Sequence, residues 1–102
     1  MKTGIELIAE ERVRQVAQEG WTPGHDDEHK RGELALAAAC YACEDYDPQP
    51  TLTANPFKLA PSHWPWDWSW WKPKDHIRNL VRAGALIAAE IDRLQRAKES
   101  KE

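Results

Sequence analysis

Asp75–Arg96 reads DHIRNLVRAGALIAAEIDRLQR and carries the strongest helical pattern in the chain. Asp75 follows Pro73 and is placed to cap the helix with its carboxylate. Over about five turns, apolar residues recur at intervals of three and four and form one stripe: Ile77, Leu80, Val81, Gly84, Ile87, Ala88, Ile91 and Leu94. A narrower stripe lies beside it: Ala83, Leu86 and Glu90. We therefore expect a helix over residues 75–97, in which Gly84 and Ala85 permit a close crossing with a neighbour.

A second helix is predicted over residues 4–19. Thr3 and Glu6 have the capping-box spacing, in which each side chain bonds a backbone N–H near the other. Apolar residues again recur at three and four: Ile5, Ile8, Ala9, Val13, Val16 and Ala17. Gly20 can end this helix in the left-handed conformation. Glu10 and Arg14 lie four residues apart, which predicts a surface ion pair.

The third predicted helix covers residues 27–44 and has no polar face. Asp26 or Asp27 is placed to cap it, and Gly32 is a weak point near its start. Its body, LALAAACYAC at residues 34–43, is apolar nearly all round. Such a helix must be enclosed on several sides, and the other two helices offer too little surface. We therefore expect an all-α fold in one domain, residues 1–102, completed by homo-oligomerisation as a dimer or larger assembly.

Residues 45–74 show no helical period and hold six of the chain's seven prolines. Five of the six tryptophans lie between residues 64 and 71. Prolines remove backbone donors and restrict their neighbours, so we expect an extended, ordered loop. If all of these indoles faced water, they would form a large exposed hydrophobic patch that is prone to association. Two interpretations follow: the rings plug the core of a small helical protein, or one or two form a stacking wall for a base or similar flat ligand.

Composition excludes several classes of function. The net charge of −3, with acids and bases interspersed, argues against binding to duplex nucleic acid. No apolar run is long enough to span a membrane and the chain starts without an apolar leader, so we expect a soluble, cytoplasmic protein. Cys40 and Cys43 are poorly disposed to form a disulfide on a helix, and no second pair completes a zinc site. We interpret both as small buried residues.

The end of the Trp-rich loop is the first candidate binding site. Asp75 starts the last helix four residues after Trp71, so the loop should lie beside the first turns of that helix. Cationic side chains there can hold phosphate oxygens while indoles hold a base. The candidate ligand-binding residues are Trp68, Trp70, Trp71, Lys72, Arg78 and Arg82. Alternatively, the two arginines form ion pairs with acids of the first helix or cover tryptophan faces as cation–π partners.

The polar run His25–His29, HDDEH, is the second candidate. Its default interpretation is a solvated helix N-terminus, where acids favour the positive end of the dipole. If a metal binds, magnesium is expected because it prefers oxygen ligands. The residues that would hold it are Glu10, Asp27, Glu28 and Glu33. The sequence shows no nucleophile with an adjacent base and no glycine-rich phosphate loop.

Several motifs resemble a family of small phage and prophage proteins whose function is mostly unknown. They are ERVRQ (11–15), EGWTP (19–23), HDD (25–27), GELA (32–35) and LVRAGALIAAEI (80–91), and together they cover nearly the whole chain. More remotely, the order of an ERxRQ helix, a Trp/His/Asp loop, a second helix and a closing helix is similar to that of MazG-like all-α nucleotide pyrophosphohydrolases.

Enzymes of the MazG-like kind hold magnesium over a nucleotide's phosphates with the carboxylates of EExxE and ExxD motifs. Here Glu33 stands where two or three carboxylates are expected, and Glu90-Ile91-Asp92 has the wrong spacing for ExxD. The resemblance implies a protein that sequesters a nucleotide or nucleotide signal, or hydrolyses it weakly with magnesium. The alternative is an interaction module that docks on a host protein through its Trp-rich loop.

Overall fold

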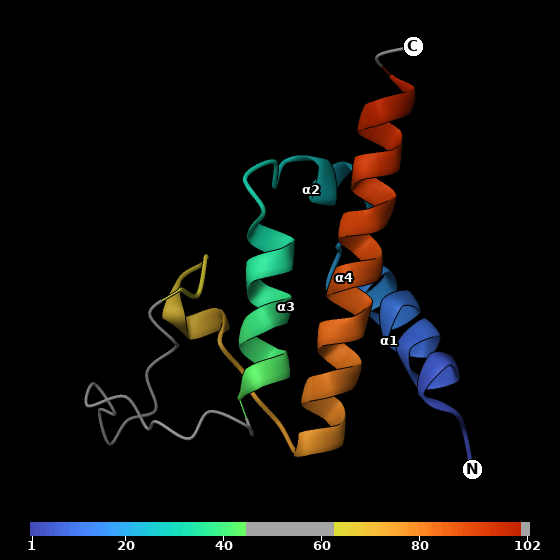
Figure 1. Ribbon diagram of the computed structural model, residues 1–102, viewed down its shortest axis with the longest axis vertical. Coiled ribbons are helices and arrows are strands. Elements are labelled where there is room, and N and C mark those ends of the chain that lie inside the picture. The colour runs from blue at the N-terminus through green and yellow to red at the C-terminus, as the bar shows by residue number, and fades with distance from the viewer. Residues whose placement is uncertain (45–62, 101–102) are drawn as a thin grey trace.

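The computed structural model describes residues 1–44 and 63–100, and within those ranges the chain is all-α, without strands. The helices are α1 (Gly4–Gln18), α2 (Pro23–Asp27), α3 (Glu33–Cys43) and α4 (His76–Glu99), with a 3₁₀ turn at Trp68–Trp70 (Figure 1). The all-α prediction is confirmed. The expected loop over 45–74 is described only from residue 63 onward, and its first part lies outside the described residues.

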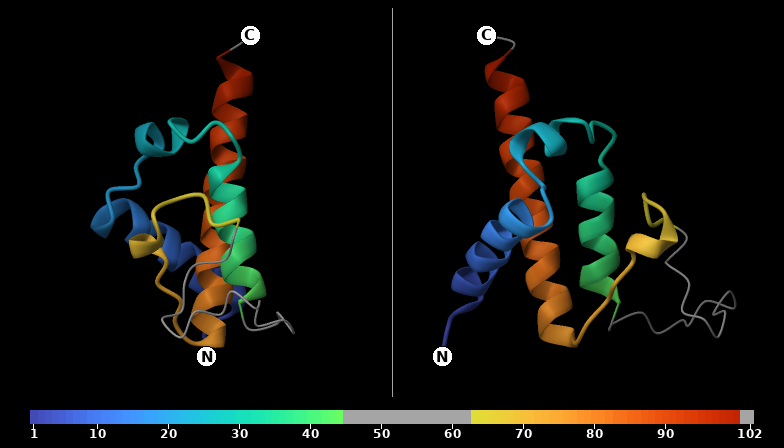
Figure 2. Two further views of the ribbon diagram at one scale, coloured as in Figure 1. Left: turned by 90° about the vertical axis from the view of Figure 1, so that its left-hand side faces the viewer. Right: turned by 180° about the vertical axis from the view of Figure 1, so that it is seen from behind.

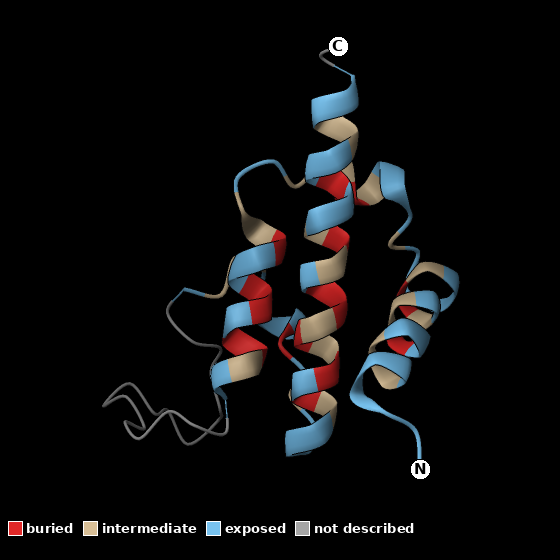
Figure 3. Ribbon diagram, turned by 45° about the vertical axis from the view of Figure 1, so that its right-hand side comes forward, coloured by how far each residue is buried: buried red, intermediate tan, exposed pale blue. Residues whose placement is uncertain are grey.

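The long helix α4 is the centre of the fold. It packs against α1, α2 and α3, with α3 and α1 on different sides of it (Figure 1 and Figure 3). The core between α3 and α4 is built largely of small side chains, which allow the two helices to approach closely. Its members from these helices are Leu34, Ala37, Ala38, Cys40, Tyr41, Ala83, Leu86 and Ala89.

Local signals determine the ends of α1 and α4. Thr3 and Glu6 form the expected capping box, and the Asp75 carboxylate accepts the Arg78 backbone N–H at 3.0 Å. Gly20 follows α1 with φ at 74°, in the left-handed region where glycine has no steric cost. These three predictions are confirmed.

The side chain of Ile8 packs closely on Gly84 where α1 crosses α4. A Cβ atom placed at position 84 would lie 2.5 Å from the Cδ1 atom of Ile8. Any larger residue at this position would therefore force the Ile8 side chain to move.

The prediction of one helix over residues 27–44 differs from the structure. Thr22 caps the separate short helix α2, which begins with Pro23, a residue well suited to a first helical position. Helix α3 begins only at Glu33, because Gly32 has φ at 82° and interrupts the helical path.

Helix α3 is enclosed on one face rather than on several. Leu34, Ala37, Ala38, Cys40 and Tyr41 are buried against the rest of the chain. The opposite face is exposed, and it includes Ala35, Leu36, Ala39 and Cys43. Both cysteines are free, but only Cys40 is buried, so the expectation that both are buried is wrong for Cys43.

Helix α4 buries its narrow stripe and leaves most of its wide one uncovered. Ala83, Leu86 and Ala89 are at most 3% exposed, because their small or compact side chains fit against the alanine-rich α3. The larger residues of the wide stripe are between 40% and 65% exposed: Ile77, Leu80, Ile87, Ile91 and Leu94. None of the helices in the described ranges is both long and apolar enough to cross a bilayer.

Candidate functional site

The described part of the Trp-rich segment runs from the side of α3 to the start of α4 (Figure 2). Two hydrogen bonds shape its 3₁₀ turn: the Asp67 carboxylate accepts the Ser69 N–H at 2.9 Å, and the Trp64 indole donates to the Asp67 carbonyl at 3.1 Å. The bond from Ser69 also lowers the pKa of Asp67. The Lys72 N–H donates to the Tyr41 hydroxyl at 3.3 Å, which ties the end of the segment to α3.

Tyr41, Trp64 and Trp71 form what we term the packed aromatic group. Their ring centroids lie 4.7 to 5.6 Å apart, the usual separation for favourable aromatic contacts. Trp71 is only 8% exposed and belongs to the hydrophobic core, against which Trp64 packs. For these two tryptophans the core-plug interpretation is correct.

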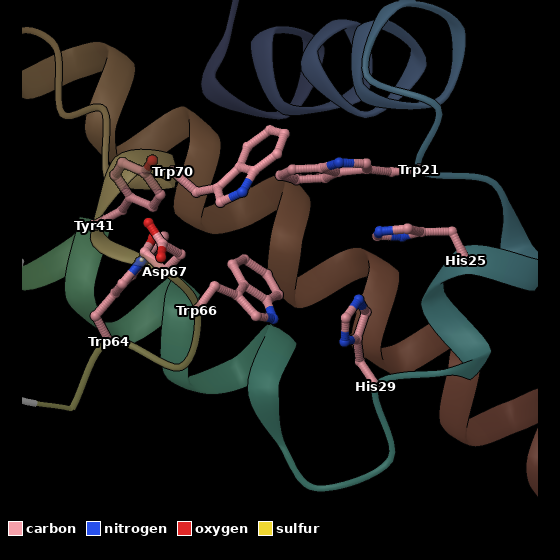
Figure 4. A pocket seen from close by; sticks show the side chains of 8 residues that line it. All are labelled: Trp21, His25, His29, Tyr41, Trp64, Trp66, Asp67 and Trp70. Atoms are coloured by element: carbon pink, nitrogen blue, oxygen red, sulfur yellow. Dashed lines mark hydrogen bonds between the residues drawn. The ribbon is translucent and has the colours of Figure 1, made fainter.

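A second set of rings surrounds an open space. Trp21, His25, His29 and Trp66 follow one another at centroid distances of 5.9, 4.8 and 5.3 Å, and Trp66 closes the circle with Trp21 at 6.1 Å (Figure 4). They line a pocket of about 340 Å³, together with Tyr41, Trp64, Asp67 and Trp70. This aromatic pocket has the volume and lining typical of small-molecule sites.

His25 is held in the wall of this pocket by a buried carboxylate. Asp26 is fully buried, and its two oxygens lie 3.2 Å from Nδ1 of His25 and 2.6 Å from a guanidinium nitrogen of Arg12. Arg12 also donates to the Trp21 carbonyl at 3.4 Å. The polar run at residues 25–29 thus supplies two rings to the pocket and one buried acid that positions the ring of His25.

A smaller hollow adjoins the aromatic pocket and shares Trp21, Tyr41 and Trp70 with it. It measures about 50 Å³, and we term it the basic hollow because three cations line it. Its remaining lining residues are Arg14, Gln15, Glu19, Lys72 and Arg82. An aromatic surface therefore lies directly beside a cationic one.

The buried carboxylate of Glu11 organises the cations behind the basic hollow. It accepts hydrogen bonds from Arg14 at 2.7 and 2.8 Å and from Arg78 at 2.6 Å. Nε of Arg82 lies farther away, at 3.9 Å. Burial raises the pKa of Glu11, but the bonds from Arg14 and Arg78 outweigh burial and hold it below the ordinary value. The carboxylate is therefore charged and acts as an anchor for arginines.

Positive charge exceeds negative charge at this site. Four cations, Arg14, Lys72, Arg78 and Arg82, are set against two carboxylates, those of Glu11 and Glu19. The Lys72 ammonium lies 5.5 Å from the Trp70 ring, and the Arg82 guanidinium 5.3 Å from the Tyr41 ring. The expectation that Arg78 and Arg82 pair with an acid of the first helix is confirmed, yet the surplus leaves the hollow attractive to an anion.

Three buried side-chain atoms in the described part of the chain have no hydrogen-bond partner: Oε1 of Gln15, Nε1 of Trp66 and Nε of Arg82. Each belongs to a residue that lines one of the two hollows. A buried polar atom without a partner costs roughly 1–3 kcal/mol. One acceptor and two donors are therefore unsatisfied on residues that line the two hollows.

The predicted ligand-binding residues are only partly brought together. Trp70, Lys72 and Arg82 line the hollows as expected. Trp68 is 65% exposed and lines neither, and Trp71 lies in the core. Arg78 is not among the residues that line either hollow.

The sequence interpretation did not assign Trp21 or Tyr41 to a site, and it considered the run His25–His29 for a metal rather than as part of an aromatic pocket. A signal was present, because Trp21, His25 and His29 are spaced by four residues, which places side chains on one side of a helical turn. Tyr41 offered no comparable signal.

The four carboxylates proposed for magnesium are not brought together. Glu10 forms a salt bridge with Lys2, and an Asp27 carboxylate oxygen lies 2.8 Å from a guanidinium nitrogen of Arg96. A carboxylate oxygen of Glu33 lies 3.4 Å from Nδ1 of His29. Glu28 is exposed. Among residues 1–44 and 63–100, no three His, Cys, Asp or Glu side chains form a group suited to a metal ion. The structure therefore does not assemble the magnesium ligands expected from the sequence.

Comparison of the chain with protein-family models, curated proteins and solved structures finds no match.

Proposed function

We propose that this protein binds a nucleotide, with the base in the aromatic pocket and the phosphates at the basic hollow. The observation that carries the proposal is the placement of the three unpartnered buried atoms, all on residues that line these adjoining hollows. In a nucleotide, a flat heteroaromatic base is joined to anionic phosphates, just as the aromatic pocket adjoins the basic hollow.

The aromatic pocket supplies stacking and one directed donor. Stacking of a base on an aromatic side chain contributes about 1–3 kcal/mol and tolerates any base. Nε1 of Trp66 has no hydrogen-bond partner in the described part of the chain, so a small rotation of this indole would let it donate to a ring nitrogen or carbonyl of the base. Trp70, at 55% exposed, has enough free surface to cover the ligand.

The basic hollow supplies charge in a fixed arrangement. Glu11 holds Arg14 by two hydrogen bonds, and the Arg82 guanidinium donates to the Lys72 carbonyl at 2.8 Å. Little side-chain entropy remains to be lost when phosphate oxygens replace water at these groups. Gln15, whose Oε1 has no hydrogen-bond partner among the described residues, also lines this hollow.

The proposal is for sequestration of the nucleotide rather than for its hydrolysis. Binding needs only the stacking, donor and cationic groups named above. Magnesium-dependent release of pyrophosphate remains a separate hypothesis, because Glu10, Asp27, Glu28 and Glu33 do not form a ligand group.

Isothermal titration calorimetry with a panel of ribonucleoside and deoxyribonucleoside triphosphates, with and without magnesium, tests the proposal. Trp70→Ala and Lys72→Gln should each weaken binding, by about 1–3 kcal/mol for the stacking partner and about 1 kcal/mol for the exposed cation. Trp68→Ala and Lys74→Gln are matched controls, since both residues are exposed in the same segment and line neither hollow. Absence of heat with every nucleotide at millimolar concentration would reject nucleotide binding.

One observation favours a second candidate function, docking on another protein. Trp68 is 65% exposed outside both hollows, and exposed tryptophans are frequent anchors at protein interfaces. In that case Trp68→Ala should be the damaging substitution, and nucleotides should leave the melting temperature unchanged.

A further inference from the structure

The uncovered face of α4 carries a regular apolar stripe. We define the α4 stripe as Ile77, Leu80, Gly84, Ile87, Ile91 and Leu94. Its spacing alternates between three and four residues, the pattern of a seam that packs against another helix. Its five large members are 40–65% exposed, so no part of the described chain covers them fully.

The α4 stripe faces away from the candidate ligand site. Ile91 lies nine residues after Arg82, about two and a half helical turns, so the two residues project from opposite sides of α4. Figure 3 shows the exposed surface of α4 as a face lying between α3 and α1. A partner on this face would leave both hollows open.

Helix α1 widens the apolar face. The side chain of Ile8 lies against Gly84, so it fills the one position of the α4 stripe that has no side chain. Ile5 and Val13 of α1 are 82% and 67% exposed. The combined face thus draws on two helices that are already packed together.

The size of this face suits a protein partner. The stripe spans 17 residue steps, or about 26 Å, and two packed helices are about 20 Å wide, which gives on the order of 500 Å². Two such faces bury about 1,000 Å², the size at which specific interfaces begin.

We infer that the α4 stripe is the contact surface for a second copy of this chain, packed antiparallel about a twofold axis. The spacing of the stripe is the same from either end, so such a copy brings Ile77 opposite Leu94 and Leu80 opposite Ile91. The remaining pair sets Ile87 opposite Gly84, where the flat surface of glycine and Ile8 accepts the larger side chain. A twofold dimer needs only one self-complementary surface, because both copies use the same residues. In the antiparallel arrangement the dipoles of the two α4 helices also point in opposite directions, which is favourable.

This assignment moves the expected interface from α3 to α4. The exposed face of α3 consists mainly of alanines and one leucine, Leu36, at 42% exposed. Helix α4 offers five large aliphatic residues in register, and their burial is the stronger driving force. The inference does not depend on nucleotide binding.

Light scattering coupled to size-exclusion chromatography tests it at tens of micromolar protein. The wild-type chain should have twice the 11.7 kDa mass of one copy, whereas Ile91→Glu and Leu94→Glu should each run as a monomer with unchanged helical circular dichroism. Leu36→Glu is the matched control on α3 and should stay dimeric. A monomeric wild-type chain would overturn the assignment. So would the reverse result, in which Leu36→Glu is a monomer and Ile91→Glu stays a dimer.

The orientation is tested by disulfide trapping in a Cys43→Ser background, which removes the exposed native thiol. Leu80→Cys and Ile91→Cys chains, mixed under reducing conditions and then oxidised, should form a covalent dimer, while each variant alone should form little. Efficient cross-linking of each variant to itself would instead indicate parallel helices and would refute the proposed pairing.

Discussion

Trp70 and Trp71 are consecutive in the sequence, yet Trp70 is 55% exposed and Trp71 only 8%. A related contrast separates the packed aromatic group (Tyr41, Trp64 and Trp71), two of whose members also reach the pocket wall, from the rings that encircle the aromatic pocket (Trp21, His25, His29 and Trp66). Rings of the first set fill space against α3 and the core. Rings of the second set stand around a space that is left open. Identical indoles in one short segment therefore play two roles.

The difference arises from what supports each set. Tyr41, at the end of α3, anchors the packed aromatic group by ring contacts and by its bond from the Lys72 N–H. Three of the four pocket rings come instead from the connection after α1, and polar contacts through Asp26 and Arg12 hold His25 and the Trp21 carbonyl there. Rings that pack directly on one another leave no space between them. Rings that are held from behind by hydrogen bonds can instead stand around an open pocket.

Trp71→Ala should give the largest loss of folding stability, because it removes the most buried tryptophan of the packed aromatic group. Truncating a buried tryptophan costs about 3–5 kcal/mol, while truncating the exposed Trp70 should cost no more than about 0.5 kcal/mol. Urea unfolding of both variants measures the difference. Equal losses of stability would mean that the two neighbouring indoles are packed alike.

Glu11→Gln should have the next largest effect, because it breaks the polar support beneath the basic hollow. Removing one charge from a buried, hydrogen-bonded pair costs about 3 kcal/mol, since the remaining arginines lose their partner. Glu10→Gln is the matched control: Glu10 is exposed and paired only with Lys2 at the surface, so its loss should stay within about 0.5 kcal/mol. Thermal and urea unfolding at neutral pH compare the two.

The pH dependence of stability sharpens this test. The pKa of Glu11 is lowered in the folded chain, so its contribution is present above the ordinary value of 4.5 and is lost as the pH falls through the folded pKa. Wild-type stability should therefore fall more steeply below pH 4.5 than that of Glu11→Gln. Parallel curves for the two proteins would show that Glu11 is not held charged by its arginines.

Local features of the sequence predicted the helix ends well. The Thr3 and Glu6 box, Gly20 and Asp75 each act within one turn, so their neighbours in the sequence decide the outcome. Gly32 is a weak point in the pattern of residues 27–44, but the sequence does not indicate that it adopts a left-handed conformation and delays the start of α3 to Glu33.

Features that depend on distant contacts were harder to predict. Periodicity revealed both stripes of α4 but not which one faces α3, because that choice depends on the small side chains of the partner helix. The aromatic pocket joins residues 21–29 to residues 64–70, and no local pattern links segments so far apart. The division of the tryptophans into packed and open sets follows from the same long-range arrangement.

Replacing Trp66 and Trp64 by phenylalanine should produce the smallest effects and compare the two aromatic sets most directly. Both indoles are partly buried. Nε1 of Trp66 has no partner among the described residues, whereas Nε1 of Trp64 donates to the Asp67 carbonyl at 3.1 Å. Trp64→Phe removes a formed hydrogen bond, so it should cost about 1 kcal/mol more stability than Trp66→Phe. Trp66→Phe removes the donor reserved for a ligand, so it should weaken nucleotide binding by about 1 kcal/mol. Paired urea unfolding and calorimetry measure both quantities, and equal losses of affinity would show that the Trp66 indole N–H does not contact the nucleotide.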